Sequence, residues 1–413
     1  MTDTRENNAM RILLFIACSA LALNACSDVL DVEYPGRIPT EQLNDPTLAA
    51  VLAGSVLGDF ECAYSNYTGG SAVHSDEYET SNSNVPGNLW GERGITAGED
   101  SYVTDACEGG YFSIQRPLHT ARFQSEQVFT KLSNWTDEQV TNRALLMAQV
   151  RTYGAYSYLL MGETFCAVAF DGGAQQPPSA ALDIARTQFL EAITLAQQAG
   201  NTDILNLARA GLARTEMNLQ SWAAAEAAAD LIPPGFRVDA GRGSDNARRW
   251  NKLFRSADQQ GAYVIADAYR VMNDPRVLVV DANRPAFNPG IDLWVTTKYT
   301  SLASPIRLAS YEEAQLILAE ALAQQGDVAG AMAVINAARA DVGLGALAAG
   351  NQAEAIQHVI NERQRELSFE GGHRLNDLLR YDIPWKLGSN PYTGRPYGQT
   401  TCWPHPTKEV NGA

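Results

Sequence analysis

The sequence predicts a mainly helical protein with long irregular loops in its N-terminal part. Apolar residues recur at helical intervals along most of the chain. Two residue pairs, Thr136 with Gln139 and Ser310 with Glu313, have the spacing of a capping box, in which side chains satisfy the free amides at a helix start. Two segments also share one internal spacing that predicts paired helices, so we expect helical repeats within a single globular body.

The N-terminus has the pattern of a secretory signal. Its apolar run, 12–25, is shorter than the roughly 20 residues that a membrane-spanning helix needs. The sequence LNAC, which ends at Cys26, resembles a bacterial lipoprotein cleavage box, so we expect removal of 1–25 and lipidation of Cys26. The alternative is an ordinary cleaved signal that leaves Cys26 as a thiol. Acidic residues near the start favour translation from Met10 rather than Met1.

The region between Phe60 and Phe112 is rich in Gly, Asn, Ser, Asp and aromatic residues, and irregular loops of this length usually have a functional reason. A sugar has an apolar face and a polar rim, so its site needs an aromatic ring beside amide, carboxylate or guanidinium groups. The candidate ligand contacts here are Tyr64, Asn66, Tyr67, Asn88, Trp90, Arg93 and Tyr102. The secondary candidates are Trp250 beside Arg249, and Trp294 with Tyr299.

The paired helices occupy segments 212–225 and 318–331, with small residues where the two helices of each pair cross. These pairs resemble tetratricopeptide units, whose repeat is about 34 residues. Segments 143–161 and 184–198 predict further helices of the same kind. Stacked neighbours of this type bury a continuous core.

The stretch 361–381 joins two charged helical segments across Gly371 and Gly372. Apolar residues over 353–370 have helical spacing, the two glycines supply a C-terminal stop, and a second helix should start near His373. Opposite charges crowd around this corner, and we expect them to form ion pairs that hold the two helices. These charged residues are Arg365, Glu366, Arg374, Asp377 and Arg380.

Charge limits the partners of this protein. The formal net charge is −16 and the sequence pI is about 4.8, which argues against nucleic acid because phosphates need a basic face. The same balance disfavours adhesion of the protein surface to anionic lipid. We therefore expect contact with a membrane through the lipid anchor only.

Two of the six cysteines belong to the signal and the proposed lipid site. The remaining four would lie outside the cytoplasm and allow three pairings, of which we favour Cys62 with Cys107 and Cys166 with Cys402. A zinc site is the alternative, but the chain has no C-x-x-C pair and no histidines at a matching spacing. We expect neither a metal nor a cofactor.

Catalytic motifs are missing from the sequence. It contains no G-x-S-x-G elbow, no H-E-x-x-H helix and no Walker-type phosphate loop. Glu312 and Glu313 are adjacent on a predicted helix, so their carboxylates point apart and do not flank a glycosidic bond. We expect a binding protein and not an enzyme.

The C-terminal corner resembles the signature of the SusD/RagB family, in which an ER-x-REL-x-FEG segment runs into an R-x-x-DL-x-R segment. The matching residues are Glu362, Arg363, Arg365, Glu366, Leu367, Phe369, Glu370, Gly371, Arg374, Asp377, Leu378 and Arg380. Gly372 is one glycine more than the pattern has. Other segments resemble the family's opening, its DPR turn, its P-x-R-L segment and its closing segment: 26–31, 274–276, 304–308 and 403–410.

The resemblance implies a lipid-anchored, surface-exposed outer-membrane protein. Such a protein captures nutrients, most often oligosaccharides, and delivers them to a TonB-dependent, SusC-like transporter. It also implies a signal at 1–25, an N-terminal region at 26–235 with repeats and a loop insertion, and a C-terminal region at 236–413 packed into the same body. Two alternatives stay open: a peptide-binding subunit of a peptide importer, and a helical-repeat scaffold that binds another protein.

Overall fold

The computed structural model describes residues 43–82, 85–98, 102, 107–108 and 112–407. Residues Pro46–Ala413 form one compact unit. The predicted signal 1–25 and the predicted lipid site Cys26 lie outside the described residues.

Helices dominate this unit, as the sequence predicts. The longer helices are α2 (Ala49–His74), α5 (Gln115–Asn134), α6 (Arg143–Thr164), α7 (Ser179–Gln198), α8 (Thr202–Asn218), α11 (Tyr311–Gln324), α12 (Val328–Asp341) and α13 (Gln352–Glu366). The shorter ones are α3 (Val85–Gly91), α9 (Trp222–Ala229), α10 (Asp267–Arg270) and α14 (His373–Arg380). The irregular helical turns are η2 (Pro46–Leu48), η3 (Ala247–Arg249) and η4 (Phe254–Gln259).

The strands form small antiparallel ladders between distant parts of the chain. They are β1 (Tyr78–Thr80), β2 (Arg237–Ala240), β3 (Tyr263–Ile265), β4 (Val279–Pro285), β5 (Asp292–Thr296) and β6 (Ile306–Ser310). β1 pairs with β3, β2 with β6, and β4 with β5. In register, Tyr78 faces Ile265 and Val279 faces Thr296.

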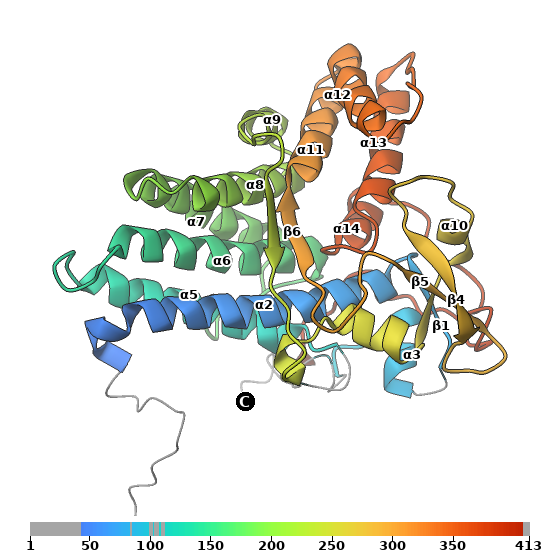
Figure 1. Cartoon of the computed structure of the whole chain (residues 1–413), viewed down its shortest axis with the longest axis horizontal. Helices are drawn as coiled ribbons and strands as arrows, with labels where there is room; N and C mark the ends of the chain where they lie inside the picture. Colours follow the sequence, from blue (N-terminus) through green and yellow to red (C-terminus); the bar gives the residue numbers. More distant parts are fainter. Residues whose placement is uncertain (1–42, 83–84, 99–101, 103–106, 109–111, 408–413) are drawn as a thin grey trace, which may run out of the picture. The chain divides into compact units, whose positions relative to one another are not determined.

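Helix pairs stack in two groups (Figure 1). α2, α5, α6, α7 and α8 lie in successive contact, and α11, α12 and α13 form the second group, which α9 joins to α8. The predicted pairs are α8 with α9 and α11 with α12, which confirms a mainly helical, tetratricopeptide-like fold. Gly211 shows why small residues are needed at a crossing, since a Cβ there would lie 2.2 Å from a ring carbon of Phe189.

The two predicted capping boxes have different outcomes. Ser310 is the N-cap of α11, and its hydroxyl accepts the amide of Glu313 at 3.3 Å. Thr136 and Gln139 do bond to one another, but they close an exposed turn, and the next helix begins only at Arg143. The prediction of a helix start at Thr136 is therefore wrong, because the same local bond also stabilises an isolated turn.

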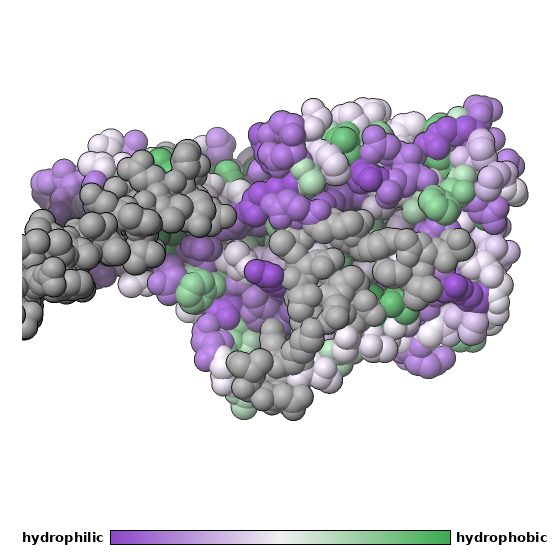
Figure 2. All heavy atoms as spheres, turned by 90° about the horizontal axis from the view of Figure 1, so that it is seen from below, coloured by the Kyte–Doolittle hydropathy of each residue, from purple (hydrophilic) through white to green (hydrophobic). Residues whose placement is uncertain are grey.

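α2 is the one described helix whose length and mean hydropathy, 1.2 over its most apolar window, would suit a membrane span. Its residues 62–74 are all buried, and α2 contacts α5, α6 and α14. Burial of this half of α2 on all sides is expected for a helix inside a core. Figure 2 shows one face of the molecule as mostly hydrophilic, with separate hydrophobic residues between.

Two disulfides tie the described cysteines. Cys62 of α2 bonds to Cys107, and Cys166, just after α6, bonds to Cys402. The second bridge spans a sequence separation of 236 residues and holds the C-terminal segment against the end of α6. These are the two pairings that the sequence analysis favours.

Arg214 of α8 lies at the centre of a buried ionic cluster. Its guanidinium donates to both carboxylate oxygens of Glu163 of α6, at 2.6 and 2.7 Å, and lies 3.4 Å from Glu313 of α11. It also donates to the backbone oxygen of Gly371 at 2.8 Å. The side chains of Arg214 and Glu163 are only 1% and 0% exposed, so one buried arginine links three helices to the C-terminal corner.

A second group of charges joins α13, α14 and α11. Arg363 binds Asp377 at 2.9 Å, while Arg380 binds the same carboxylate at 2.9 Å and Glu320 at 2.5 Å. Burial raises the pKa of Asp377, but the two guanidinium groups lower it by more, so its pKa lies below the usual value. The ion pair that crosses the glycine corner is therefore Arg363 with Asp377, whereas the predicted Arg365, Glu366 and Arg374 pair with residues elsewhere in the chain.

Glu370, at the corner itself, connects it to β5 and β6. Its carboxylate accepts from Arg307 at 2.5 Å and from Lys298 at 2.9 Å. Lys298 also donates to the backbone oxygens of Glu366 and Ser368, at 3.1 and 3.0 Å. Further pairs made by the signature residues are Arg374 with Asp76 and Arg365 with Asp274.

Gly371 and Gly372 are required by both conformation and space. Their φ angles are +49° and +75°, where side chains are strained. A Cβ on Gly371 would lie 2.6 Å from the Tyr64 hydroxyl, and one on Gly372 would lie 2.4 Å from the Tyr67 ring. The corner therefore sits directly on two tyrosines of α2.

Glu77 bonds the loop after α2 to the same corner. It is 2% exposed, and its carboxylate accepts the amide of Phe369 at 2.5 Å. Burial raises the pKa of Glu77 to about 8, although the Phe369 amide opposes the rise.

We expect Arg214→Met to lower the free energy of unfolding by about 3–5 kcal/mol, because it leaves Glu163 and Glu313 buried without their cation. Urea denaturation measures the change. The control is Arg237→Met, which removes an exposed pair with Asp239 and should cost less than about 1 kcal/mol. Equal losses in the two variants would contradict the central role of Arg214.

We also expect Glu77→Gln to flatten the pH dependence of stability. The folded pKa of Glu77 lies above the ordinary value of 4.5, so above that pH the folded protein keeps a proton that the unfolded chain releases. Stability from this group is full below the unfolded pKa and is lost as pH rises toward 8. The unfolding free energy of the variant should fall less than that of the wild type between about pH 5 and about pH 8. Parallel curves for the two proteins would refute a raised pKa.

Candidate ligand-binding site

The candidate ligand contacts from the N-terminal region are all buried. Their exposed fractions are 4% or less: Tyr64, Asn66, Tyr67, Asn88, Trp90, Arg93 and Tyr102. A ring without an exposed face cannot stack on a sugar, so the structure corrects the prediction that these side chains form an open platform. They build the core beneath the loops.

The contacts of these side chains show what they do instead. Tyr64 donates to the backbone oxygen of Arg307 at 2.5 Å, and Tyr67 donates to Glu163 at 3.2 Å. Trp90 lies edge-on to Trp403, with ring centroids 5.8 Å apart. Over residues 62–74 the periodicity of the chain fades because α2 is buried there on all sides.

The remaining polar and aromatic candidates of this region make similar internal contacts. Asn66 accepts the amide of Ser113 at 3.2 Å. Arg93 donates to the backbone oxygen of Lys386 at 2.6 Å, and its guanidinium lies 5.1 Å from the centroid of the Trp385 ring. Tyr102 lies edge-on to Trp90, at 6.3 Å between centroids, and Asn88 is 1% exposed.

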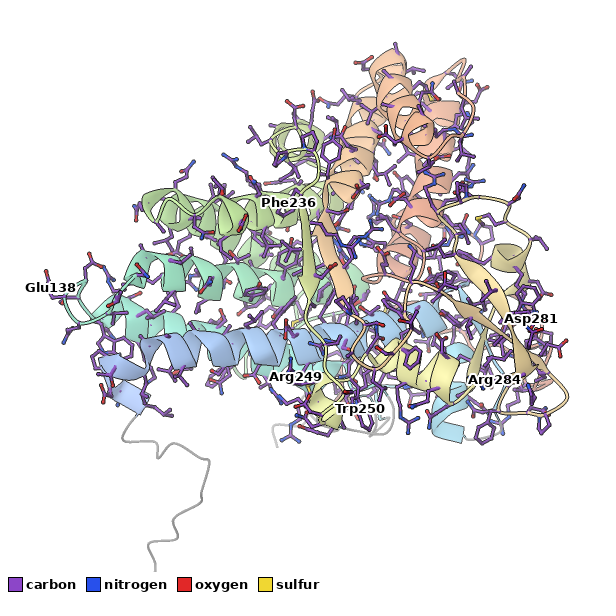
Figure 3. The ribbon with its side chains drawn as sticks, in the orientation of Figure 1. Glu138, Phe236, Arg249, Trp250, Asp281 and Arg284 are labelled. Carbon is purple, nitrogen blue, oxygen red and sulfur yellow. A yellow bond between two sulfur atoms is a disulfide. The ribbon has the colours of Figure 1, made fainter. Side chains whose placement is uncertain are left out.

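The secondary candidates do not converge on one site. Trp250 is half-buried beside η3, and the Arg255 guanidinium lies 5.7 Å from the centroid of its ring. Figure 3 shows Trp250 apart from Asp281 and Arg284 of β4, the strand that pairs with the β5 strand of Trp294. Trp294 is half-buried on β5. Tyr299 is 4% exposed and donates to the backbone oxygen of Phe369 at 3.0 Å, so it supports the corner.

An open cavity of about 480 Å³ lies where the β4–β5 hairpin, the segment after β1 and a C-terminal loop meet. Its volume is within the range of small-molecule sites. The side chains that give it polar and aromatic character are Asn82, Phe287, Asn288, Tyr392, Thr393 and Arg395. We call this the Phe287 cavity.

Phe287 stands at the tip of the β4–β5 hairpin and is 55% exposed. The tip is fixed by main-chain bonds, because the Phe287 amide donates to the Gly261 oxygen at 2.8 Å and the Ile291 amide donates to the Asn288 oxygen at 3.0 Å. Gly261 has φ +65°, and a Cβ there would lie 2.9 Å from the Phe287 nitrogen. A large apolar ring is thus held at the cavity on a rigid turn.

The segment after β1 forms a second wall. Ser81 donates its hydroxyl to the Gly261 oxygen at 2.5 Å, and the Asn82 amide group donates to the Ala262 oxygen at 3.1 Å. Both side chains are therefore anchored to the same turn that holds Phe287. The second wall and the aromatic tip form one unit.

The third wall is the loop from Tyr392 to Arg395. The side-chain oxygen of Asn390 accepts the amides of Tyr392 and Thr393 at 2.8 and 3.0 Å. The Tyr392 hydroxyl accepts from Arg270 at 2.6 Å, which keeps the phenol ring at the cavity. Asn390 is itself anchored, since it donates to the buried Glu79 at 3.3 Å.

The cavity has the chemistry of a binding site for a neutral polyol. An exposed ring offers a stacking face, and amide, hydroxyl and guanidinium groups offer donors and acceptors around it. No carboxylate is among the described residues that line it, so it has no pair of acids that could hydrolyse a glycosidic bond. Within the described parts of the chain, no group of three or more His, Cys, Asp or Glu residues could hold a metal ion.

Sequence reasoning missed Phe287, Asn288 and Tyr392 because it looked for a site only in the irregular N-terminal region and at tryptophans. A usable signal was present, since Phe287 and Asn288 put an aromatic ring beside an amide within a Pro-Gly turn. The joining of this turn to the segment after β1 depends on the β1–β3 pairing, which no local pattern predicts.

Comparisons with known proteins agree with this fold. Residues 294–408 match the family model of the SusD family, and no curated protein matches the chain in sequence. A SusD homolog from Bacteroides thetaiotaomicron has 16% identity over 91% of this chain and 97% of that chain, with a TM-score of 0.69. A SusD-like carbohydrate-binding protein from Bacteroides vulgatus has 14% identity over 82% and 83%, with a TM-score of 0.64.

A laminarin-binding SusD-like protein has 17% identity over 88% of this chain and 97% of that chain, with a TM-score of 0.59. At these identities the structural likeness shows the fold, and the C-terminal corner supplies the sequence match. The predicted resemblance to the SusD/RagB family is confirmed: residues 294–408 match the family model, and the chain has the fold of SusD-like proteins.

Proposed function

We propose that this protein captures carbohydrate in the Phe287 cavity. The observation that carries the proposal is the exposed ring of Phe287, held on a rigid hairpin tip beside Asn82, Asn288 and Arg395. Sugars stack their apolar face on such a ring and bond their hydroxyls to the amide and guanidinium groups around it.

The relatives support the same ligand class. One similar structure is that of a laminarin-binding protein and another is that of a carbohydrate-binding protein. The uncharged lining of most of the cavity suits neutral oligosaccharides, and Arg395 adds one cation, which can donate to a sugar hydroxyl or pair with an acidic sugar. We infer that the protein binds the ligand and does not cleave it.

We further propose that the protein is anchored to the outer membrane by a lipid on Cys26 and delivers its ligand to a TonB-dependent, SusC-like transporter. The support for this is the cleavage-box sequence before Cys26 and the match of residues 294–408 to the SusD family model. One lipidated residue would leave the body free above the membrane, which suits capture of large nutrients.

We expect Phe287→Ala to weaken oligosaccharide binding by about tenfold or more, because it removes the stacking face. Isothermal titration calorimetry against a panel of oligosaccharides, with short peptides as a parallel panel, would measure this. The control is Leu387→Ala, which removes an apolar side chain that is 83% exposed and lies outside the cavity lining. If Phe287→Ala bound oligosaccharides as tightly as Leu387→Ala and the wild type do, the site would be refuted. If the wild type bound peptides and no sugar, the ligand class would be refuted.

We expect Cys26→Ser to move the protein from the membrane fraction to the soluble fraction of cells, because the thiol that carries the lipid is gone. Fractionation followed by immunoblotting measures this, with Cys18→Ser as the control that alters only the signal. A Cys26→Ser protein that stays with membranes would show that another feature holds it there.

A further inference from the structure

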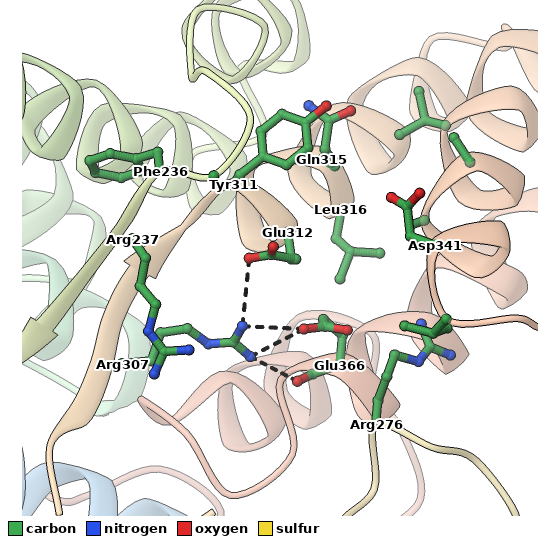
Figure 4. Close-up of a pocket in the computed structure, with 15 residues that line it drawn as sticks. Phe236, Arg237, Arg276, Arg307, Tyr311, Glu312, Gln315, Leu316, Asp341 and Glu366 are labelled. Atoms are coloured by element: carbon green, nitrogen blue, oxygen red, sulfur yellow. Dashed lines mark hydrogen bonds and ion pairs between the residues drawn. The ribbon is translucent and has the colours of Figure 1, made fainter.

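A separate cleft of about 380 Å³ lies between the start of β2, α11 and α12 (Figure 4). It shares no lining residue with the Phe287 cavity. We call it the Asp341 cleft, after the carboxylate at one end of it. Its volume is close to the lower limit for small-molecule sites, so it accommodates one or two side chains and not a long oligomer.

The floor of the Asp341 cleft is apolar. Leu316 of α11, Val334 and Ala338 of α12, and Val342 just after α12 line it. Figure 4 shows Phe236 at the opposite wall. Phe236 is half-buried, so part of its ring stays available to a ligand. This surface can take up one aliphatic or aromatic side chain.

The arginines that line the cleft already have partners. Arg307 binds Glu370 at 2.5 Å and Glu366 at 3.2 Å. Arg276 binds Asp274 at 2.8 Å and Glu362 at 2.7 Å, while Arg237 binds Asp239 at 3.0 Å. An anionic ligand would have to compete with carboxylates for Arg307 and Arg276, whereas Arg237 is 56% exposed and bonds Asp239 through Nε alone.

The carboxylates at the rim are in the opposite situation. Asp341 is exposed and makes no hydrogen bond or ion pair with the described residues. Glu312 is 47% exposed, and its only ion pair among them is a 3.7 Å contact with Arg307, whose guanidinium is already held by closer carboxylates. Figure 4 shows these two acids on either side of Leu316.

Neutral polar groups complete the rim. The side-chain amide of Gln315 and the hydroxyl of Tyr311 make no hydrogen bond with the described part of the chain. Both can donate and accept, so they can bond a peptide backbone. The cleft therefore combines an apolar floor, the unpaired carboxylate of Asp341, the weakly paired carboxylate of Glu312, and two groups suited to an amide.

We propose that the Asp341 cleft binds a short peptide segment that carries an apolar side chain next to a lysine or arginine. The apolar side chain lies on Leu316 and Val334, and the cation lies between Glu312 and Asp341. A cation gains from carboxylates that lack a close partner, whereas an acidic segment meets like charge at Glu312 and Asp341 and finds Arg276 and Arg307 already paired. This ligand differs in class from the saccharide of the Phe287 cavity.

The test uses the purified mature protein and three tetrapeptides with blocked ends, Gly-Leu-Lys-Gly, Gly-Leu-Glu-Gly and Gly-Gly-Lys-Gly. Calorimetry or ligand-observed NMR should show that the Leu-Lys peptide binds about tenfold or more tightly than either of the others. Its affinity should fall as salt increases, because the carboxylates are exposed. Equal binding of the Leu-Glu peptide, or no binding of any of the three, would overturn the proposal.

Variants place the peptide in the cleft. Asp341→Asn should weaken binding of the Leu-Lys peptide about threefold or more, and Ala338→Trp, which fills the floor, should abolish it. The matched control is Asp230→Asn, which makes the same carboxylate-to-amide change at the end of α9, outside the cleft lining. It should leave the affinity for the peptide unchanged. If a thermal melt shows that Ala338→Trp is not folded, the affinity of Asp341→Asn alone tests the assignment of the peptide to the cleft. Equal affinities for the two Asp→Asn variants would overturn the assignment of the cleft.

Discussion

The buried salt bridge between Arg214 and Glu163 is the constraint on which the rest of the structure depends. It is formed by side chains of α8 and α6, and its arginine reaches Glu313 of α11 and the backbone of Gly371. A buried charge is costly unless it is paired and hydrogen-bonded. The helices that carry these groups can therefore pack in one register only, in which every charge finds its partner.

Each of the three walls of the Phe287 cavity is joined along the chain to residues that bind the glycine corner or its ion pairs, and Arg214 binds the same corner. β5 ends at Thr296, shortly before Lys298, which binds Glu370, and the tip of its hairpin carries Phe287. β1 begins beside Glu77, which accepts the amide of Phe369. The third wall follows α14, whose Asp377 is held by Arg363. Charges in the core thus set the geometry of a cavity that contains few charges itself.

Sequence patterns were most informative where one local rule decides the structure. The glycine corner, the N-cap at Ser310 and the repeat helices follow from spacing, capping and positive φ. The same spacing rule failed at Thr136, where a side-chain bond closes a turn and no helix follows. The charged residues of the corner were predicted to pair with one another, but Arg380 binds Glu320 on a distant helix and Arg374 binds Asp76 after α2. No local pattern connects these partners to the corner.

The site was the part that the sequence predicted least well. Composition alone cannot distinguish an aromatic ring in a loop from one in a core, and Tyr64, Tyr67 and Trp90 belong to the core. The exposure of Phe287 depends on how the hairpin tip meets Gly261, a contact between segments that are joined only by tertiary structure. Sequence alone also cannot single out Asp341. It differs from other surface acids only because the fold places an apolar floor, formed in part by α11, beside it.

The most direct measurement is a crystal structure of the protein with an oligosaccharide that binds in solution. Our account predicts electron density for a sugar ring within about 4 Å of the Phe287 ring, with hydroxyls bonded to Asn82, Asn288 or Arg395. Density for the ligand elsewhere, for example on Trp250, with an empty Phe287 cavity would contradict it.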